Sequence, residues 1–167
     1  MSTSRPTRKE HIIITIKNIV NYQPRTSTVQ NIFRLLLGAA LLYAGITHLT
    51  VARTEFLAQV PTWLPLDGDL VVVLSGIVEI TLGLALIFVR RYRALVGWLA
   101  AIFFVLIFPG NISQYTNGID AFGLNTDMAR LVRLFFQPLL VLWALWCTGA
   151  WQAWRNRHQS AAPRRAF

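Results

Sequence analysis

The chain has 167 residues, of which 54% are hydrophobic and 14% are charged, and its net charge is +9. Soluble domains carry about 25% charged residues, so this composition argues against a soluble protein and for one integral membrane domain. The basic residues flank apolar runs and form no stripe on a foldable soluble surface. We therefore expect membrane lipids as partners and no nucleic acid.

Residues 1–30 are expected to form a basic cytoplasmic tail, and residues 153–167 a second one. Within the first tail, the segment HIIITIKNIVNY (11–22) repeats isoleucine at helical spacing, with polar residues on the other side. It is shorter than the roughly 20 residues that cross a bilayer. We expect an interfacial amphipathic helix here, and the many isoleucines leave a β-strand as the alternative.

Four long apolar segments make residues 31–152 a four-helix transmembrane domain. The predicted spans are 32–51, 70–89, 94–109 and 129–151. The third is short for a span, so we expect that it continues past Pro109 or that the bilayer thins around it. The predicted fold class is all-α: an integral membrane four-helix bundle with a short N-terminal amphipathic segment.

Lysine and arginine predict the orientation of this bundle. They gather in both tails and in the turn 90–93, whereas the loop 52–69 holds only Arg53 and the loop 110–128 holds none. Loops rich in these residues stay on the cytoplasmic side of a membrane. We therefore expect both termini in the cytoplasm and the two longer loops outside.

Glu79 lies near the middle of the second span, where an acid costs about 2.5–3.5 kcal/mol on insertion scales. Two glycines share its helical face, and small residues line helix contacts in membranes. Glu79 is therefore expected to face other helices. Arg133 or Gln137 of the fourth span, at similar depth, is the expected partner, with His48 nearby.

Each predicted helix brings a polar group to its interior face, and all of these groups fall in the outer half of the bundle. They can converge on one pocket that opens to the outside. The structural alternative is that they fix helix register, cap a helix or reach headgroups. Their number favours a ligand or proton site. The candidate binding residues are His48, Glu79, Asn111, Arg130, Arg133 and Gln137.

Five motifs, in this order and spacing, resemble the DoxX family of small four-helix membrane proteins. They are AGITHL (44–49), VPTWLP (60–65), SGIVEITLGLALI (75–87), FPGNI (108–112) and RLFFQPLLVLWALW (133–146). The family includes the small subunit of a thiosulfate:quinone oxidoreductase. With this resemblance we expect a multi-pass protein of the bacterial plasma (inner) membrane.

The resemblance and the polar pocket together predict a membrane component of a redox or detoxification system. His48 and Glu79 would exchange protons, while Arg133 and Gln137 would bind an oxygen-bearing headgroup. No haem, metal or nucleotide signature occurs, and a quinone is the cofactor class left open. A soluble or membrane redox protein and a second copy of the chain are the partners left open.

Two other functions fit the same residues. The first is a non-catalytic scaffold or assembly factor, in which the polar network holds the helices in register and the basic cytoplasmic face docks a partner. The second is a small-solute transporter, which a four-helix chain can form only as an oligomer or around a very small solute. Whether the protein is an enzyme is left open.

Overall fold

The computed structural model describes Thr7 and residues 25–161, with side chains up to Asn156. Every described element is a helix, and four helices are long and apolar enough to cross a membrane, which confirms the predicted fold class. The long helices are α2 (Thr28–Leu49), α4 (Gly68–Phe88), α5 (Arg93–Thr116) and α6 (Asp127–Cys147). Two shorter helices are α3 (Arg53–Leu57) and α7 (Ala150–Ala161). The amphipathic segment predicted at 11–22 lies outside the described residues.

Three of the long helices begin at a side-chain cap. Ser27 and Gln30 form a capping box at the start of α2. The side chains of Asp67 and Thr126 accept hydrogen bonds from backbone amides in the first turns of α4 and α6. Each cap satisfies an amide that helix geometry leaves unpaired. These caps place the helix starts ahead of the apolar runs that the sequence pattern detects.

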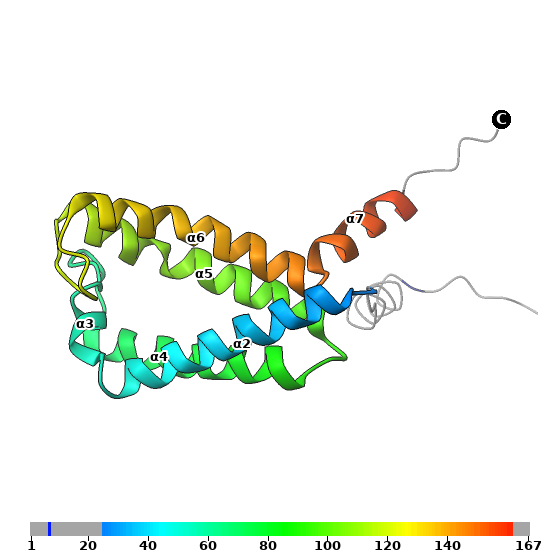
Figure 1. Ribbon diagram of the computed structural model, residues 1–167, viewed down its shortest axis with the longest axis horizontal. Helices are drawn as coiled ribbons and strands as arrows, with labels where there is room; N and C mark the ends of the chain where they lie inside the picture. The colour runs from blue at the N-terminus through cyan, green and yellow to red at the C-terminus, as the bar shows by residue number, and fades with distance from the viewer. Residues whose placement is uncertain (1–6, 8–24, 162–167) are drawn as a thin grey trace, which may run out of the picture.

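Two of the long helices end at residues other than those predicted from the sequence. The helix α5 continues past Pro109 to Thr116, which is one of the two outcomes expected for the short third span. The helix α6 ends at Cys147, before the predicted end at 151. Gly149 adopts a φ of 72°, a left-handed conformation that glycine adopts without steric cost, and the chain turns there into α7. Figure 1 shows α7 leaving the bundle, and the C-terminal tail predicted at 153–167 begins within this helix.

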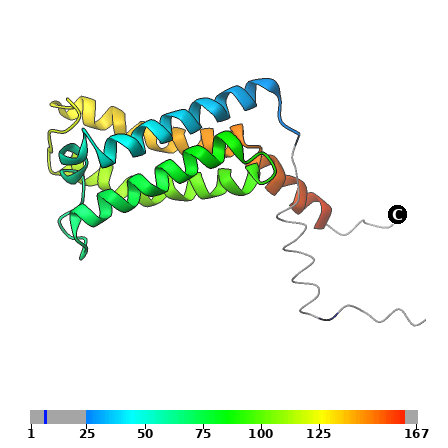
Figure 2. The same ribbon diagram turned by 90° about the horizontal axis from the view of Figure 1, so that it is seen from below.

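The long helices form two pairs, with α2 packed along α4 and α5 along α6. In Figure 1 the two pairs converge at one end and diverge toward the other. Figures 1 and 2 both place the start of α2 and α7 at one end, which we call the terminal end. The opposite end carries α3 and residues 117–126, and we call it the loop end.

Glycines bring α2 and α4 close together. A Cβ added at Gly45 of α2 would lie 2.6 Å from the carbonyl oxygen of Gly76 on α4, and one added at Gly83 would lie 2.7 Å from the carbonyl oxygen of Gly38. Small residues permit such backbone contact between helices in a membrane. The pairing of α2 with α4 therefore depends on these four glycines.

At the terminal end the two pairs bond to each other directly. The side-chain amide of Gln30 on α2 donates to the carbonyl of Trp146 on α6, at 2.7 Å. The indole of Trp143 donates to the carbonyl of Phe33, at 3.1 Å. Most of the buried apolar core lies in this half of the bundle. The pairs are thus fixed together at the terminal end, and the cavity described next lies toward the other end.

Candidate functional site

At the loop end, short connecting segments bridge the two helix pairs. Gln59, just after α3, donates from Nε2 to the Oε1 of Gln114 on α5, at 2.9 Å. The Oε1 of Gln59 accepts a hydrogen bond from Nη2 of Arg133 on α6, at 3.1 Å. The rings of Phe56 and Phe122 pack edge to face, with centroids 4.6 Å apart. We call Phe56, Gln59 and Phe122 the cover.

The cover is held in place by charged groups at its edges. Arg53, at the start of α3, donates from Nε to Asp69 on α4 at 2.7 Å, and this hydrogen bond raises the pKa of Arg53 above its usual value. The backbone amide of Phe122 donates to a carboxylate oxygen of Glu55, at 2.6 Å. These contacts connect α3 both to α4 and to the loop between α5 and α6.

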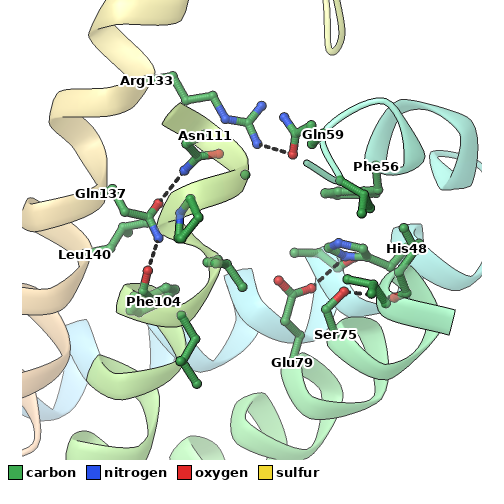
Figure 3. Close-up of a pocket in the computed structure, with 18 of the residues that line it drawn as sticks. His48, Phe56, Gln59, Ser75, Glu79, Phe104, Asn111, Arg133, Gln137 and Leu140 are labelled. Carbon is green, nitrogen blue, oxygen red and sulfur yellow. Dashed lines mark hydrogen bonds and ion pairs between the residues drawn. The ribbon is translucent and has the colours of Figure 1, made fainter. Parts of the chain in front are cut away.

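Beneath the cover lies a cavity of about 470 Å³. Pockets that bind small molecules have volumes of about 300–1,000 Å³, with mostly apolar walls and a few polar groups. All four long helices contribute to this one, and its deep walls are apolar. Figure 3 shows polar side chains facing it from several elements. The polar lining residues include His48, Gln59, Ser75, Glu79, Asn111, Arg133 and Gln137.

His48 and Glu79 lie within ion-pair distance of each other on one side of this cavity. Nδ1 of His48 lies 2.7 Å from Oε2 of Glu79 and 3.0 Å from the carbonyl oxygen of Ala44, and both side chains are buried. Because a carbonyl and a carboxylate only accept hydrogen bonds, Nδ1 carries the hydrogen. The ring of His48 stacks on Phe56 of the cover. A Cβ at Gly76 would come within 2.9 Å of the Cβ of His48, so a glycine there makes room for this histidine.

The carboxylate of Glu79 is not fully satisfied by this contact. The Nδ1 hydrogen is aligned with the carbonyl of Ala44, and the buried Oε2 of Glu79 has no well-aligned hydrogen-bond donor among the described residues. Most buried polar atoms in proteins have such a partner, so an exception calls for an explanation. A donor group on a bound molecule would supply the missing hydrogen bond.

On the opposite side, two buried amides join α5 and α6. Asn111 donates to the Oε1 of Gln137 at 2.8 Å, and Gln137 donates to the carbonyl oxygen of Phe104 at 2.5 Å. Because α5 runs on to Thr116, Asn111 lies within the helix and does not cap it. These bonds fix Gln137 toward α5, across the cavity from Glu79 (Figure 3).

The guanidinium of Arg133 lies at the part of the cavity nearest the cover. Besides its bond to Gln59, it lies over the ring of Phe122, 4.8 Å from the ring centroid. Among the described residues, no carboxylate lies within ion-pair distance of Arg133, so Arg133 is not paired with Glu79. The expectation that Arg133 or Gln137 pairs with Glu79 is therefore wrong. The glycine contacts bring α2, with His48, against α4, while the cavity separates α4 from α6.

Arg130 lies apart from the cavity. Its guanidinium forms ion pairs with Asp120 at 2.6 Å and Asp127 at 2.7 Å, and donates to the carbonyl of Leu124 at 3.0 Å. It therefore holds the loop 117–126 against the start of α6. The structure brings the other five predicted residues to the cavity wall and leaves Arg130 out of it.

The sequence pattern missed the cover. Gln59 lies in a connection between spans, where helical periodicity gives no signal. The sequence feature that could have indicated a role for Gln59 is its position directly before the motif VPTWLP. Ser75, one turn before Glu79 on α4, donates to the carbonyl of Val72 within its own helix, at 2.9 Å. Across the part of the chain that the structure describes, no three His, Cys, Asp or Glu side chains gather as metal ligands.

Residues 37–148 match a family described as a domain of unknown function (DUF8561). The chain belongs to this family. The matched segment begins at Leu37, on the wall of the cavity, and contains every residue that lines the cavity. No curated protein and no solved structure matches the chain. The part that defines this DUF8561 protein as a family member is thus the part that builds the cavity.

Proposed function

We propose that this DUF8561 protein is a membrane component of a redox or detoxification system, and that its cavity binds a small amphipathic molecule with an oxygen-bearing headgroup. One observation carries the proposal: a cavity of about 470 Å³ joins apolar walls to the guanidinium of Arg133 and to Glu79, whose buried Oε2 has no well-aligned hydrogen-bond donor among the described residues. Polar and charged groups inside a membrane are costly and are a mark of ligand or proton sites.

Arg133 and Glu79 would contact different atoms of the headgroup. Arg133 has nitrogens beyond the one bonded to Gln59, and these can donate to a carbonyl or acid oxygen of the headgroup. Glu79 accepts a hydrogen bond from a hydroxyl or amine of the same molecule. The His48–Glu79 pair can also exchange a proton with it, because an imidazole and a carboxylate are common general acids and bases. The reduced form of a quinone has hydroxyl groups that can donate to Glu79, and the oxidised form has carbonyl oxygens that can accept from Arg133.

The resemblance to the DoxX family supports the redox or detoxification setting. The arginine distribution supports an orientation with both termini in the cytoplasm and the loop end outside, in a bacterial plasma membrane. In that orientation the cover faces the outer solution, and the cavity occupies the outer half of the bundle.

A scaffold is the second candidate, because some polar groups also join helices. Gln137 links α6 to α5, and Gln59 links the cover to both. If these bonds serve only packing, the cavity binds nothing.

The test is mass spectrometry of the small molecules that the protein retains when it is purified with native lipids. We expect one species to be retained by the wild type and by Arg90→Met, in which an exposed arginine at the terminal end is changed. The same species should be lost from Arg133→Met and from Glu79→Gln. A folded wild type that retains nothing, or equal retention by all four proteins, would contradict ligand binding and support the scaffold.

A further inference from the structure

The wall of the cavity includes side chains that are exposed at the middle of the membrane. Ala40 of α2 and Phe136 of α6 both line the cavity and lie near the centres of their helices. Ala40 is exposed, and Phe136 is 58% exposed. A span of about 20 residues crosses a hydrocarbon core of about 30 Å, so both positions face lipid tails. A residue that lines a cavity and is also exposed at this depth marks an opening toward lipid.

This opening follows from the way the two pairs are joined. The bonds between α2 and α6, from Gln30 to Trp146 and from Trp143 to Phe33, lie at the terminal end. Toward the loop end the pairs diverge (Figure 1). Where they diverge, the lining residues of α2 include the small side chains of Ala40 and Ala44, and those of α6 include Phe136 and Leu140. These four lining residues, Ala40, Ala44, Phe136 and Leu140, are called the seam below.

We infer that the ligand is a membrane-resident amphipath that enters sideways through the seam. Its hydrocarbon chain lies in the seam, and its oxygen-bearing head reaches Arg133 and Glu79. This inference rests on the proposed function and names the class and route of its ligand.

Toward the loop end the cover obstructs the cavity, because Phe56 stacks on His48 and Gln59 binds both α5 and α6. Trp63 also lines the cavity there and is 67% exposed, so this side is not sealed. The seam differs from it because the seam lies at the depth of the lipid tails.

The other side of the cavity is a less suitable entrance. Leu106 of α5 lines the cavity and is 71% exposed, which opens one wall there. The α4 residues that line the cavity are buried or half-buried, so the facing wall is closed. At the seam, by contrast, α2 and α6 each contribute an exposed lining residue, Ala40 and Phe136. The seam is therefore the entrance that the structure favours.

The test uses monostearin, a monoacylglycerol, with a photoreactive diazirine in the middle of its acyl chain, because its hydroxyls can donate to Glu79 and its ester carbonyl can accept from Arg133. The full chain is reconstituted in phosphatidylcholine vesicles and irradiated, and the labelled residues are mapped by peptide mass spectrometry. Labelling that excess unlabelled monostearin removes is counted as specific. We expect specific labelling of α2 and α6 at the seam, because the acyl chain should lie there while the polar head reaches Arg133 and Glu79.

The decisive variants differ by one position. Ala40→Phe fills the seam and should remove most of the specific labelling. Ala39→Phe adds the same ring to the neighbouring residue, which is exposed but does not line the cavity, and should leave the labelling unchanged. Phe136→Ala widens the seam and should increase the labelling. This truncation of an exposed side chain keeps the test decisive even if Ala40→Phe does not fold.

Other outcomes would overturn the inference. Specific labelling confined to α4 and α5 would place the entrance on the opposite side. Equal labelling of Ala40→Phe and Ala39→Phe would show that the seam is not used. If the wild type retains a native molecule but shows no specific labelling, the lateral route is wrong while the proposed function stands. If it retains no molecule and shows no specific labelling, both are wrong.

Discussion

His48 on α2 and Glu79 on α4 lie 2.7 Å apart, buried between two helices that both cross the membrane. The acid in the middle of the second span is thus stabilised by an imidazole from the neighbouring helix. The pair also forms part of the cavity wall, so it contributes both to helix packing and to the candidate site.

We expect the two residues of this pair to be energetically coupled. Removing one partner of a buried ion pair costs about 3–5 kcal/mol, while removing both is often close to neutral. His48→Leu and Glu79→Leu should each lower the unfolding temperature in detergent, and the double variant should recover much of the loss. Arg133→Met combined with Glu79→Leu should give nearly additive effects, because no contact joins those residues. Strong coupling of Glu79 to Arg133, with none to His48, would refute the pairing.

The close contact of α2 and α4 predicts that Gly45 does not tolerate a side chain. Gly45→Ala places a methyl group 2.6 Å from the Gly76 carbonyl oxygen, so the helices must separate. Overpacking of this kind costs about 1–3 kcal/mol. Gly68→Ala is the matched control, because its Cβ meets only an ordinary contact at 3.4 Å from Leu57. Gly45→Ala should lower the thermal unfolding temperature and Gly68→Ala should not. Equal effects of the two substitutions would argue against glycine-mediated pairing of α2 with α4.

The packing of α2 on α4 shows which features the sequence predicts and which it does not. Hydropathy predicts four spans because length and apolar composition are local properties, and interior faces follow from helical spacing. Which helices are neighbours is not a local property, so the sequence predicts the wrong helix as the source of the partner for Glu79. The sequence signal for the true pairing of α2 with α4 lies in four glycines: Gly38 and Gly45 of α2 face Gly76 and Gly83 of α4.

Orientation is tested with single cysteines. Cys147, the one cysteine in the chain, is fully buried, so an introduced thiol at an exposed position is the accessible one. A membrane-impermeant thiol reagent should label Thr62→Cys and Asn125→Cys, both at the loop end, on intact cells. Arg90→Cys, at the terminal end, should react only after the membrane is permeabilised. The reverse pattern would place the loop end in the cytoplasm.

The central claim is that the cavity holds a membrane-resident amphipath. An experimental structure of the protein, purified with its native lipids and never stripped by harsh detergent, tests this claim most directly. We predict elongated density that does not belong to the chain, with its head within hydrogen-bond distance of Arg133 and Glu79. Its tail should leave the bundle between Ala40 and Phe136. A cavity filled by rearranged side chains, or occupied by ordered water alone, would contradict the account.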